Sequence, residues 1–308
     1  MTPATGTSDP RSPLRTGLLG TGPWAVATHA PALAGHPGVT FAGVWGRRPE
    51  AAAELAAAHG VPAYEDVDAL FAACDAVTFA LPPDVQAPLA VRAAAAGCHV
   101  LLDKPVATDP VRAREVADAV ALARVASVVF FTLRFATGPA DWIARQAERK
   151  DWFTARAHWL ATLFTPGAAV SPYAASPWRG EKGPLWDVGP HALSVLVPVL
   201  GEVTEVTAAP GPGDTVHLVL RHASGASATA ALSFTAPVAA AGAGVEFLGE
   251  AGVTALPDWG PAEESFRAAL DALLEAVRTG VPHPCDAAFG ARITDVLARA
   301  ERQLGAAG

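Results

Sequence analysis

The segment WDVGPHAL, from Trp186 to Leu193, places an acid and a histidine four residues apart among glycine, proline and apolar neighbours. An imidazole supported by a carboxylate can take up a proton, so Asp187 and His191 are candidates for general acid–base chemistry. Asp before a Gly-Pro step also fits an ordinary turn followed by a helix that begins near Pro190. The chemical interpretation therefore requires a cofactor and a third reactive group elsewhere in the chain.

A lysine, Lys104, lies just past the apolar run HVLL in the segment HVLLDKPVA. That run predicts a strand, and ligands of open α/β sheets bind at the carboxyl ends of the strands. An amine there can hydrogen-bond a substrate hydroxyl, stabilise a developing alkoxide or relay a proton. A surface lysine in a strand-to-helix turn is the alternative, and spacing alone favours it.

The segment GLLGTGPWA contains the GxGxxA version of the dinucleotide fingerprint, after the first expected strand and at the start of the first expected helix. Gly20 permits the tight turn, Gly22 lets the backbone approach a pyrophosphate, and Ala25 keeps the helix close to the sheet. A glycine-rich turn without a ligand is the alternative, but the surrounding βαβ pattern favours nucleotide binding. The candidate contacts are Gly20, Thr21, Gly22, Pro23, Trp24 and Ala25.

The end of the second expected strand, VWGRRPE, bears on the choice of cofactor. Gly46 stands where NAD-binding chains usually carry an acid for the ribose hydroxyl. Arg47 and Arg48 can pair with a 2′-phosphate or stack on adenine, which favours NADP over NAD. A solvated arginine pair is the alternative.

Strand-like and helix-like segments alternate up to about residue 135, which predicts a parallel, doubly wound Rossmann sheet with right-handed crossovers. We assign residues 14–135 to this NAD(P)-binding domain and expect the polar residues 1–13 to form a disordered tail. The expected strands are 15–20, 39–45, 76–80, 99–102 and 127–132; the expected helices are 27–35, 49–60, 67–73, 85–96 and 110–122.

Residues 136–308 carry strand-like runs joined by short glycine-bearing turns, which predict an open, mostly antiparallel sheet with helices on one face. We assign them to an α+β domain for substrate binding and oligomerisation, whose last helices can pack back on the Rossmann domain. The Pro-, Gly- and Ser-bearing stretch 164–183 predicts a loop able to close a cleft, with Tyr173 facing solvent. The expected strands are 153–163, 203–208, 215–221, 226–234, 245–248 and 253–256, and the closing helices are 263–279 and 286–304.

Composition excludes several classes of protein. A net charge of -8 without basic runs argues against a nucleic-acid partner. The apolar runs are too short for a membrane helix, and no secretory signal is evident, so we expect a cytoplasmic protein. Cys74, Cys98 and Cys285 are widely spaced, so we predict neither a disulfide framework nor a metal site.

Together these motifs resemble the glucose-fructose oxidoreductase, inositol dehydrogenase and rhizopine-catabolism (Gfo/Idh/MocA) oxidoreductases. The stretch ALPPDVQAPLAVRAAAAGCHVLLDKPVA is similar to that family's TPxxxH to EKP segment, and PWRGEKGPLWDVGPHAL is similar to its WR…GG…DxGxH segment. FFTLRF and HPCDAAFGARITDVLARA also match in order and spacing. The resemblance covers nearly the whole chain after the tail and implies the two-domain fold inferred above.

Carried over by position, the resemblance implies Lys104, Asp187 and His191 as catalytic residues and a cis bond between Lys104 and Pro105. Departures are Asp103 for the usual Glu, Gln86 where the family often has His, and Ser194 near positions where sugar-specific members often carry an acid or amide. Further implied cofactor contacts are Leu81, Pro82, Asp103, Lys104, Arg134, Trp178 and Arg179.

The implied reaction moves a hydride from a CH–OH group of a sugar, polyol or cyclic diol to a nicotinamide. His191 is the expected base, Asp187 orients its imidazole and favours the charged form, and Lys104 hydrogen-bonds the same hydroxyl. Direct proton transfer by Lys104 is the nearest variant. A catalytically silent NAD(P)-binding regulator and a redox-assisted glycosidase are the alternatives, and a homodimer or homotetramer through the C-terminal sheet is expected.

Overall fold

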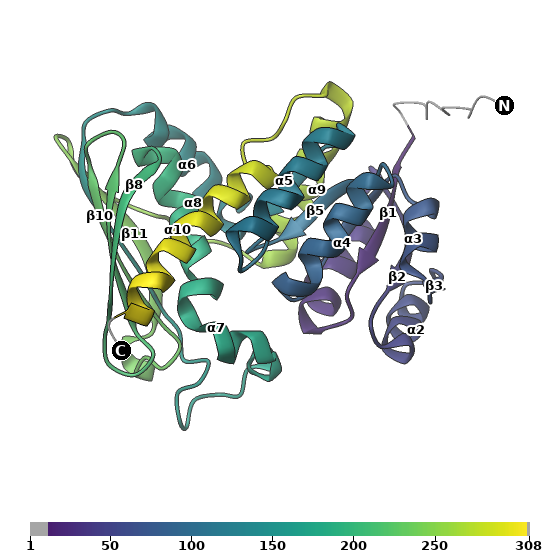
Figure 1. The fold of residues 1–308 in the computed structure, drawn as a ribbon, viewed down its shortest axis with the longest axis horizontal. Coiled ribbons are helices and arrows are strands. Elements are labelled where there is room, and N and C mark those ends of the chain that lie inside the picture. The colour runs from purple at the N-terminus through teal and green to yellow at the C-terminus, as the bar shows by residue number, and fades with distance from the viewer. Residues whose placement is uncertain (1–11, 307–308) are drawn as a thin grey trace.

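Two six-stranded sheets, one in each half of the chain, organise residues 12–306, which are the residues that the computed structural model describes (Figure 1). Of the tail expected at 1–13, residues 1–11 lie outside this described part. Within 12–306, no helix combines the length and apolar character that a membrane span needs.

The first sheet is parallel throughout and has the strand order β3-β2-β1-β4-β5-β6. The order reverses between β1 and β4, and doubly wound sheets bind their ligands at the carboxyl ends of the strands beside such a reversal. The expected Rossmann topology is confirmed, with one short strand, β3, that the sequence did not predict. The strands are β1 (Leu14–Leu19), β2 (Val39–Trp45), β3 (Ala63–Tyr64), β4 (Ala76–Phe79), β5 (His99–Asp103) and β6 (Ser127–Phe130).

The helix after β1 opens with a π-helical turn, Ala25–His29, before α1 (Ala30–Gly35), whereas a single α-helix over 27–35 was expected. The helix α9 (Ala262–Thr279) packs on β5 and β6, and α10 (Ala287–Ala306) packs on α5 and reaches the second sheet (Figure 1). The other helices of this half are α2 (Pro49–Ala58), α3 (Val67–Ala73), α4 (Pro83–Ala95) and α5 (Pro110–Ala123).

The second sheet has the order β12-β11-β7-β10-β9-β8 and is antiparallel except for the pair β7 and β10. Along β9 the residues alternate between buried and exposed, because helices cover only one face of the sheet. The strands are β7 (Trp152–Leu160), β8 (Val203–Pro210), β9 (Val216–His222), β10 (Ser227–Ser233), β11 (Gly242–Gly249) and β12 (Gly252–Ala255); the helices of this part are α6 (Pro139–Glu148), α7 (Pro177–Asp187) and α8 (Gly189–Leu200).

The loop expected over 164–183 is helical in its last part. Pro177 opens α7, which is tolerated because the first helical N–H groups have no partner within the helix. The helix is kinked at Gly183, whose φ of 67° lies in the left-handed region. The expectation was wrong because Pro and Gly are turn signals along the chain, although each also occurs at a helix start or kink.

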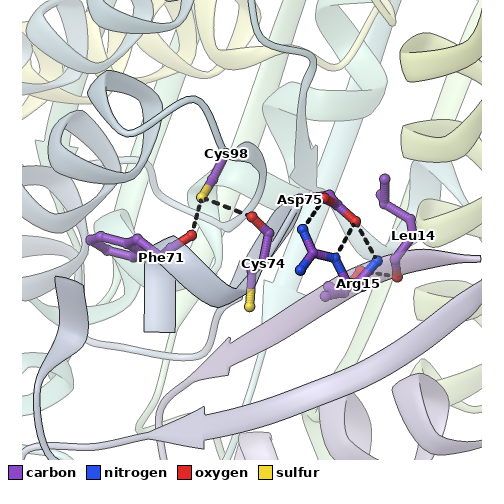
Figure 2. A network of polar contacts seen from close by, with 7 residues as sticks. Leu14, Arg15, Phe71, Cys74, Asp75 and Cys98 are labelled. Atoms are coloured by element: carbon purple, nitrogen blue, oxygen red, sulfur yellow. Dashed lines mark hydrogen bonds and ion pairs between the residues drawn. The ribbon is translucent and has the colours of Figure 1, made fainter. Parts of the chain in front are cut away.

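The cysteines of the first domain are core residues. The thiol of Cys98 donates to the carbonyls of Phe71 and Cys74, at 3.4 and 3.7 Å. Figure 2 shows these contacts, with the Cys74 sulfur pointing away from Cys98. Burial raises the pKa of Cys74 to about 12 and that of Cys98 to about 11. Beside them Arg15 forms an ion pair with Asp75 that joins β1 to the start of β4 (Figure 2).

Candidate active site

A cleft of about 570 Å³ lies at the carboxyl ends of β1, β4 and β5, where the order of the first sheet reverses. Its volume is in the range of small-molecule sites. It is lined by Gly20, Thr21, Gly22, Pro23, Trp24, Arg47, Arg48, Ala80, Leu81, Pro82, Asp103, Lys104, Pro172, Tyr173, Ala175, Ser176, Pro177, Trp178 and Arg179. These include every predicted cofactor contact except Ala25, Gly46 and Arg134.

The three exceptions do not line the cleft. Ala25 and Gly46 are buried beneath the turn, and a Cβ on Gly46 would come within 2.6 Å of the Thr21 side chain. The guanidinium of Arg134 donates to the carbonyl of Ser194 at 3.3 Å and lies over the ring of Phe289. Arg134 therefore contacts α8 and α10 instead of the cleft.

The two glycines of the turn suit a dinucleotide for different reasons. Gly20 has φ +131°, and a Cβ there would lie 2.3 Å from the carbonyl oxygen of Ala80, so the turn itself requires glycine. A Cβ on Gly22 would meet no atom within 4 Å. The space beside Gly22 is thus open for a pyrophosphate at the start of the helix, and the residues present fit the cofactor.

These contacts predict opposite outcomes for two alanine variants. We expect Gly22→Ala to keep the melting temperature of the parent protein and to weaken NADH binding roughly tenfold or more, because its methyl group enters the pyrophosphate space. Gly20→Ala should instead lower the melting temperature by several degrees, since strain at a left-handed position costs about 1–3 kcal/mol. Thermal unfolding and fluorescence titration with NADH measure the two effects, and unchanged NADH affinity in Gly22→Ala would contradict the assignment.

The turn that carries Lys104 is held by Gln86, a fully buried residue of α4. Its amide nitrogen lies 2.8 Å from the carbonyl of Asp103 and 3.2 Å from those of Pro105 and Val106, and its amide oxygen accepts from the Asp103 N–H at 2.9 Å. The amide nitrogen and the amide oxygen of Gln86 thus both hydrogen-bond the backbone of the turn. The peptide bond between Lys104 and Pro105 is cis, as the resemblance implied.

Lys104 reaches Asp187 across the junction of the two halves of the chain. Its ammonium Nζ donates to Asp187 Oδ1 at 2.5 Å and to the Asp187 carbonyl at 2.8 Å. Arg179 Nε donates to the other carboxylate oxygen at 2.9 Å. Burial alone would raise the pKa of Asp187, but the two cations outweigh it and hold that pKa well below its ordinary value.

His191 lies in the first turn of α8, next to this network but without the expected partner. Both oxygens of Asp187 are taken by Lys104 and Arg179, and the ring nitrogen Nδ1 of His191 is buried with no hydrogen-bond partner among the described residues. Burial and the charge of Lys104, against the carboxylate of Asp187, lower the pKa of His191 to about 3. The sequence predicted that Asp187 orients this imidazole and favours its charged form. The described residues show no bond between the two side chains, and the favourable charge of Asp187 is outweighed by burial and by Lys104.

Asp103 is the other acid at the cleft. Its carboxylate accepts the Lys104 backbone N–H at 2.8 Å, and burial raises its pKa to about 6 despite the neighbouring Lys104 charge. Asp103, which is shorter than the family's usual Glu, therefore accepts a hydrogen bond from the backbone of its own turn.

The segment 172–179 covers one side of the cleft and supplies lining residues that the sequence did not predict. Tyr173, expected to face solvent, is half-buried and packs edge-on against Trp24 with ring centroids 6.0 Å apart. The Arg179 guanidinium lies over the rings of Tyr173 and Trp178, at 5.6 and 4.9 Å. A Ser-Pro pair stands directly before both Tyr173 and Trp178. Each pair marks a helix start, at Pro172 for a short 3-10 helix and at Pro177 for α7.

Solved structures support the fold at low sequence identity. GenD2 from gentamicin A biosynthesis, in complex with NAD, is 20% identical with a TM-score of 0.82, and the match covers 100% of this chain and 98% of that chain. The WlbA dehydrogenase from Bordetella pertussis, in complex with NADH and UDP-GlcNAcA, is 21% identical with a TM-score of 0.82. The match covers 96% of this chain and 98% of that chain. UDP-N-acetylglucosamine 3-dehydrogenase GnnA from Acidithiobacillus ferrooxidans is 22% identical with a TM-score of 0.79. The match covers 95% of this chain and 98% of that chain.

Two family models match the sequence itself and together span most of it. Residues 14–132 match the oxidoreductase family model with an NAD-binding Rossmann fold, and residues 154–255 match the corresponding C-terminal domain. The first range holds the nucleotide turn and Lys104, and the second holds Asp187 and His191. The chain therefore belongs to the Gfo/Idh/MocA family of oxidoreductases.

Proposed function

We propose that this oxidoreductase transfers a hydride between a nicotinamide cofactor and a secondary alcohol, or its ketone, on a sugar, polyol or cyclic diol. The observation that carries the proposal is the bond between Lys104 Nζ, which lies on the wall of the nucleotide cleft, and Asp187, which lies behind that wall beside His191. The solved structures of similar fold include enzymes that bind or act on sugar nucleotides, which supports the same substrate class.

The side chains divide the work as follows. A bound nicotinamide supplies the hydride acceptor. An ammonium has three N–H donors, and Asp187 takes two of those on Lys104, so the third is free for the substrate oxygen. His191 is neutral at pH 7 because its pKa is low, and it can accept the hydroxyl proton. Asp187 pairs with both Lys104 and Arg179 and offsets part of their positive charge.

Turnover with candidate substrates tests the proposal. Polyols, aldoses and dihydrodiols are screened for reduction of NADP or NAD, followed by the absorbance of the reduced nicotinamide. Net reduction with any member of these classes supports the dehydrogenase. Glycoside cleavage without net reduction would favour the redox-assisted glycosidase, and cofactor binding without turnover on any of them would favour the regulator.

We also propose that NADP is the preferred cofactor, since Arg47 and Arg48 are exposed at the cleft. NADPH should then raise the melting temperature more than NADH does, and Arg47→Ala with Arg48→Ala should remove the difference. Each charged contact to a phosphate contributes about 1.5–3 kcal/mol, so loss of both contacts should weaken NADPH binding roughly a hundredfold or more. Arg278→Ala is the control, because Arg278 is exposed and pairs with Glu275. Equal shifts by the two cofactors in the parent protein would contradict the preference.

Association through the second sheet stays a prediction. The uncovered face of that sheet carries Val219 and Val253, which are 51% and 61% exposed. We propose that a second copy of the chain covers this face in a homodimer or homotetramer, which light scattering measures.

A further inference from the structure

What holds the imidazole of His191 is Trp159, a residue of β7. The two rings stack with their centroids 4.5 Å apart and their planes at 17°. No described residue bonds Nδ1 of His191, and the two oxygens of Asp187 accept from Lys104 and Arg179 instead. The indole is therefore the contact that sets the plane of the ring.

Trp159 is itself well placed for this task. In β7 it pairs with Leu232 of β10 on one side and Ala243 of β11 on the other, so its Cα position is fixed by two strands. The indole of Trp259 packs beside it, with centroids 5.8 Å apart at 33°. A ring supported in this way loses little further freedom when it stacks on His191.

We propose that Trp159 is a positioning residue: its indole orients His191 for proton transfer and stabilises the imidazolium that forms when His191 takes the hydroxyl proton. The inference rests on the proposed function, in which His191 is the base. Nδ1 is enclosed, so the proton passes through Nε2. A cation stacked on an aromatic face is attracted to it, and the attraction is absent while the imidazole is neutral. The contact is thus stronger after proton transfer than before it, as catalysis requires.

The charged groups around His191 disfavour its protonated form on balance. Lys104 at the end of β5 and Arg179 in α7 both disfavour a proton on the ring, and only Asp187 favours one. Burial acts in the same direction as the two cations. The π face of Trp159 is the further group that favours the charged form.

The test compares Trp159→Phe with Trp159→Leu. Both shorten the side chain and keep it apolar, but only Phe keeps an aromatic face toward His191. We expect kcat to fall roughly tenfold in the Leu variant, as the loss of one desolvated cation–π contact implies, and to fall much less in the Phe variant. KM should change little in either variant, because in this proposal Trp159 contacts His191 and not the substrate. A rise in KM with unchanged kcat would mean that the indole stacks on the substrate, and would overturn the proposal.

Proton NMR of the protein without cofactor supplies a readout that does not depend on activity. The ring current of the indole should move the His191 Hε1 signal upfield, and this displacement should vanish in Trp159→Leu and persist in part in Trp159→Phe. The signal is assigned by its loss in His191→Asn. A His191 signal that is the same in the parent and in Trp159→Leu would overturn the stack.

The failure of this inference and that of the proposed function can be told apart. If His191→Asn loses turnover while Trp159→Leu keeps it, the positioning role is wrong and His191 remains the base. If His191→Asn keeps turnover, the assignment of His191 as base is wrong, and the positioning role is overturned with it.

Discussion

Replacement of Lys104 by Met should lower kcat by roughly 10²–10³-fold while leaving NADH affinity within a few-fold of the parent value. Met keeps the length and apolar stem of lysine but removes the N–H donor that we propose bonds the substrate oxygen. The side chain of Lys104 is only 10% exposed, so its ammonium acts in a region where water replaces a lost hydrogen bond poorly. Steady-state kinetics and an NADH titration on the same preparation measure the two quantities.

Folding of the variant needs its own check, because removing one partner of a buried ion pair can cost about 3–5 kcal/mol. Asp187 keeps its bond from Arg179, which moderates that cost. Lys182→Met is a matched control, since Lys182 lies in α7 and pairs with Glu301 outside the cleft. Unchanged turnover in Lys104→Met with a normal melting temperature would return Lys104 to the role of an ordinary turn residue.

A double variant separates chemistry from charge balance. If Lys104 and Asp187 act as one unit, Lys104→Met combined with Asp187→Asn should lose about as much kcat as Lys104→Met alone. Additive losses would mean that the two side chains serve separate steps.

The nucleotide turn could be predicted from the sequence because all of its parts lie within a few residues of one another. Gly20 and Gly22 meet local requirements, a left-handed φ and an open space, that glycine satisfies wherever it stands in such a turn. The same holds for β2 and α3, whose bounds match the expected segments residue for residue, since their apolar periodicity is a local property.

The partners within the site could not be predicted in the same way. Lys104 and Asp187 are separated by 83 residues, and only packing of the two halves of the chain brings them together. The separation of four residues between Asp187 and His191 suggested a pair, yet α7 ends at Asp187 and α8 begins at Gly189, so the two side chains belong to different helices. The parallel pairing of β7 with β10 was missed for a similar reason. Local alternation shows which face of a strand is buried, but not the direction of its neighbour.

A second large effect concerns stability in acid. His29 is fully buried, and neither of its ring nitrogens has a partner among the described residues. Burial lowers its pKa to about 3, whereas an exposed histidine in the unfolded chain has a pKa of about 6.5. Because the unfolded state binds the proton first, the free energy of unfolding falls as the pH drops from about 6.5 toward 3.

The expected loss from His29 alone is about 2 kcal/mol between pH 7 and pH 5. His29→Leu should remove this part of the pH dependence, because Leu has a similar volume and no titratable group. The variant should also be more stable than the parent at pH 7, since it no longer buries two unpartnered nitrogens beside Phe266. Urea unfolding at both pH values measures the difference, and His217→Gln, an exposed position on β9, is the control.

His191 contributes to the acid dependence with the same sign, because its pKa is also lowered to about 3. The stability lost in acid through His191 differs from that lost through His29 in its response to bound cofactor. We expect a cofactor bound in the cleft beside Lys104 to change the surroundings of His191 and to leave His29 buried. Saturation with NADPH should then change the His191 contribution and not the His29 contribution. The prediction would be contradicted if the free energy of unfolding fell with pH equally steeply in the parent and in His29→Leu, with or without cofactor. That result would mean that His29 takes up its proton in the folded state, where a water or a shift of the π-helical turn satisfies its ring.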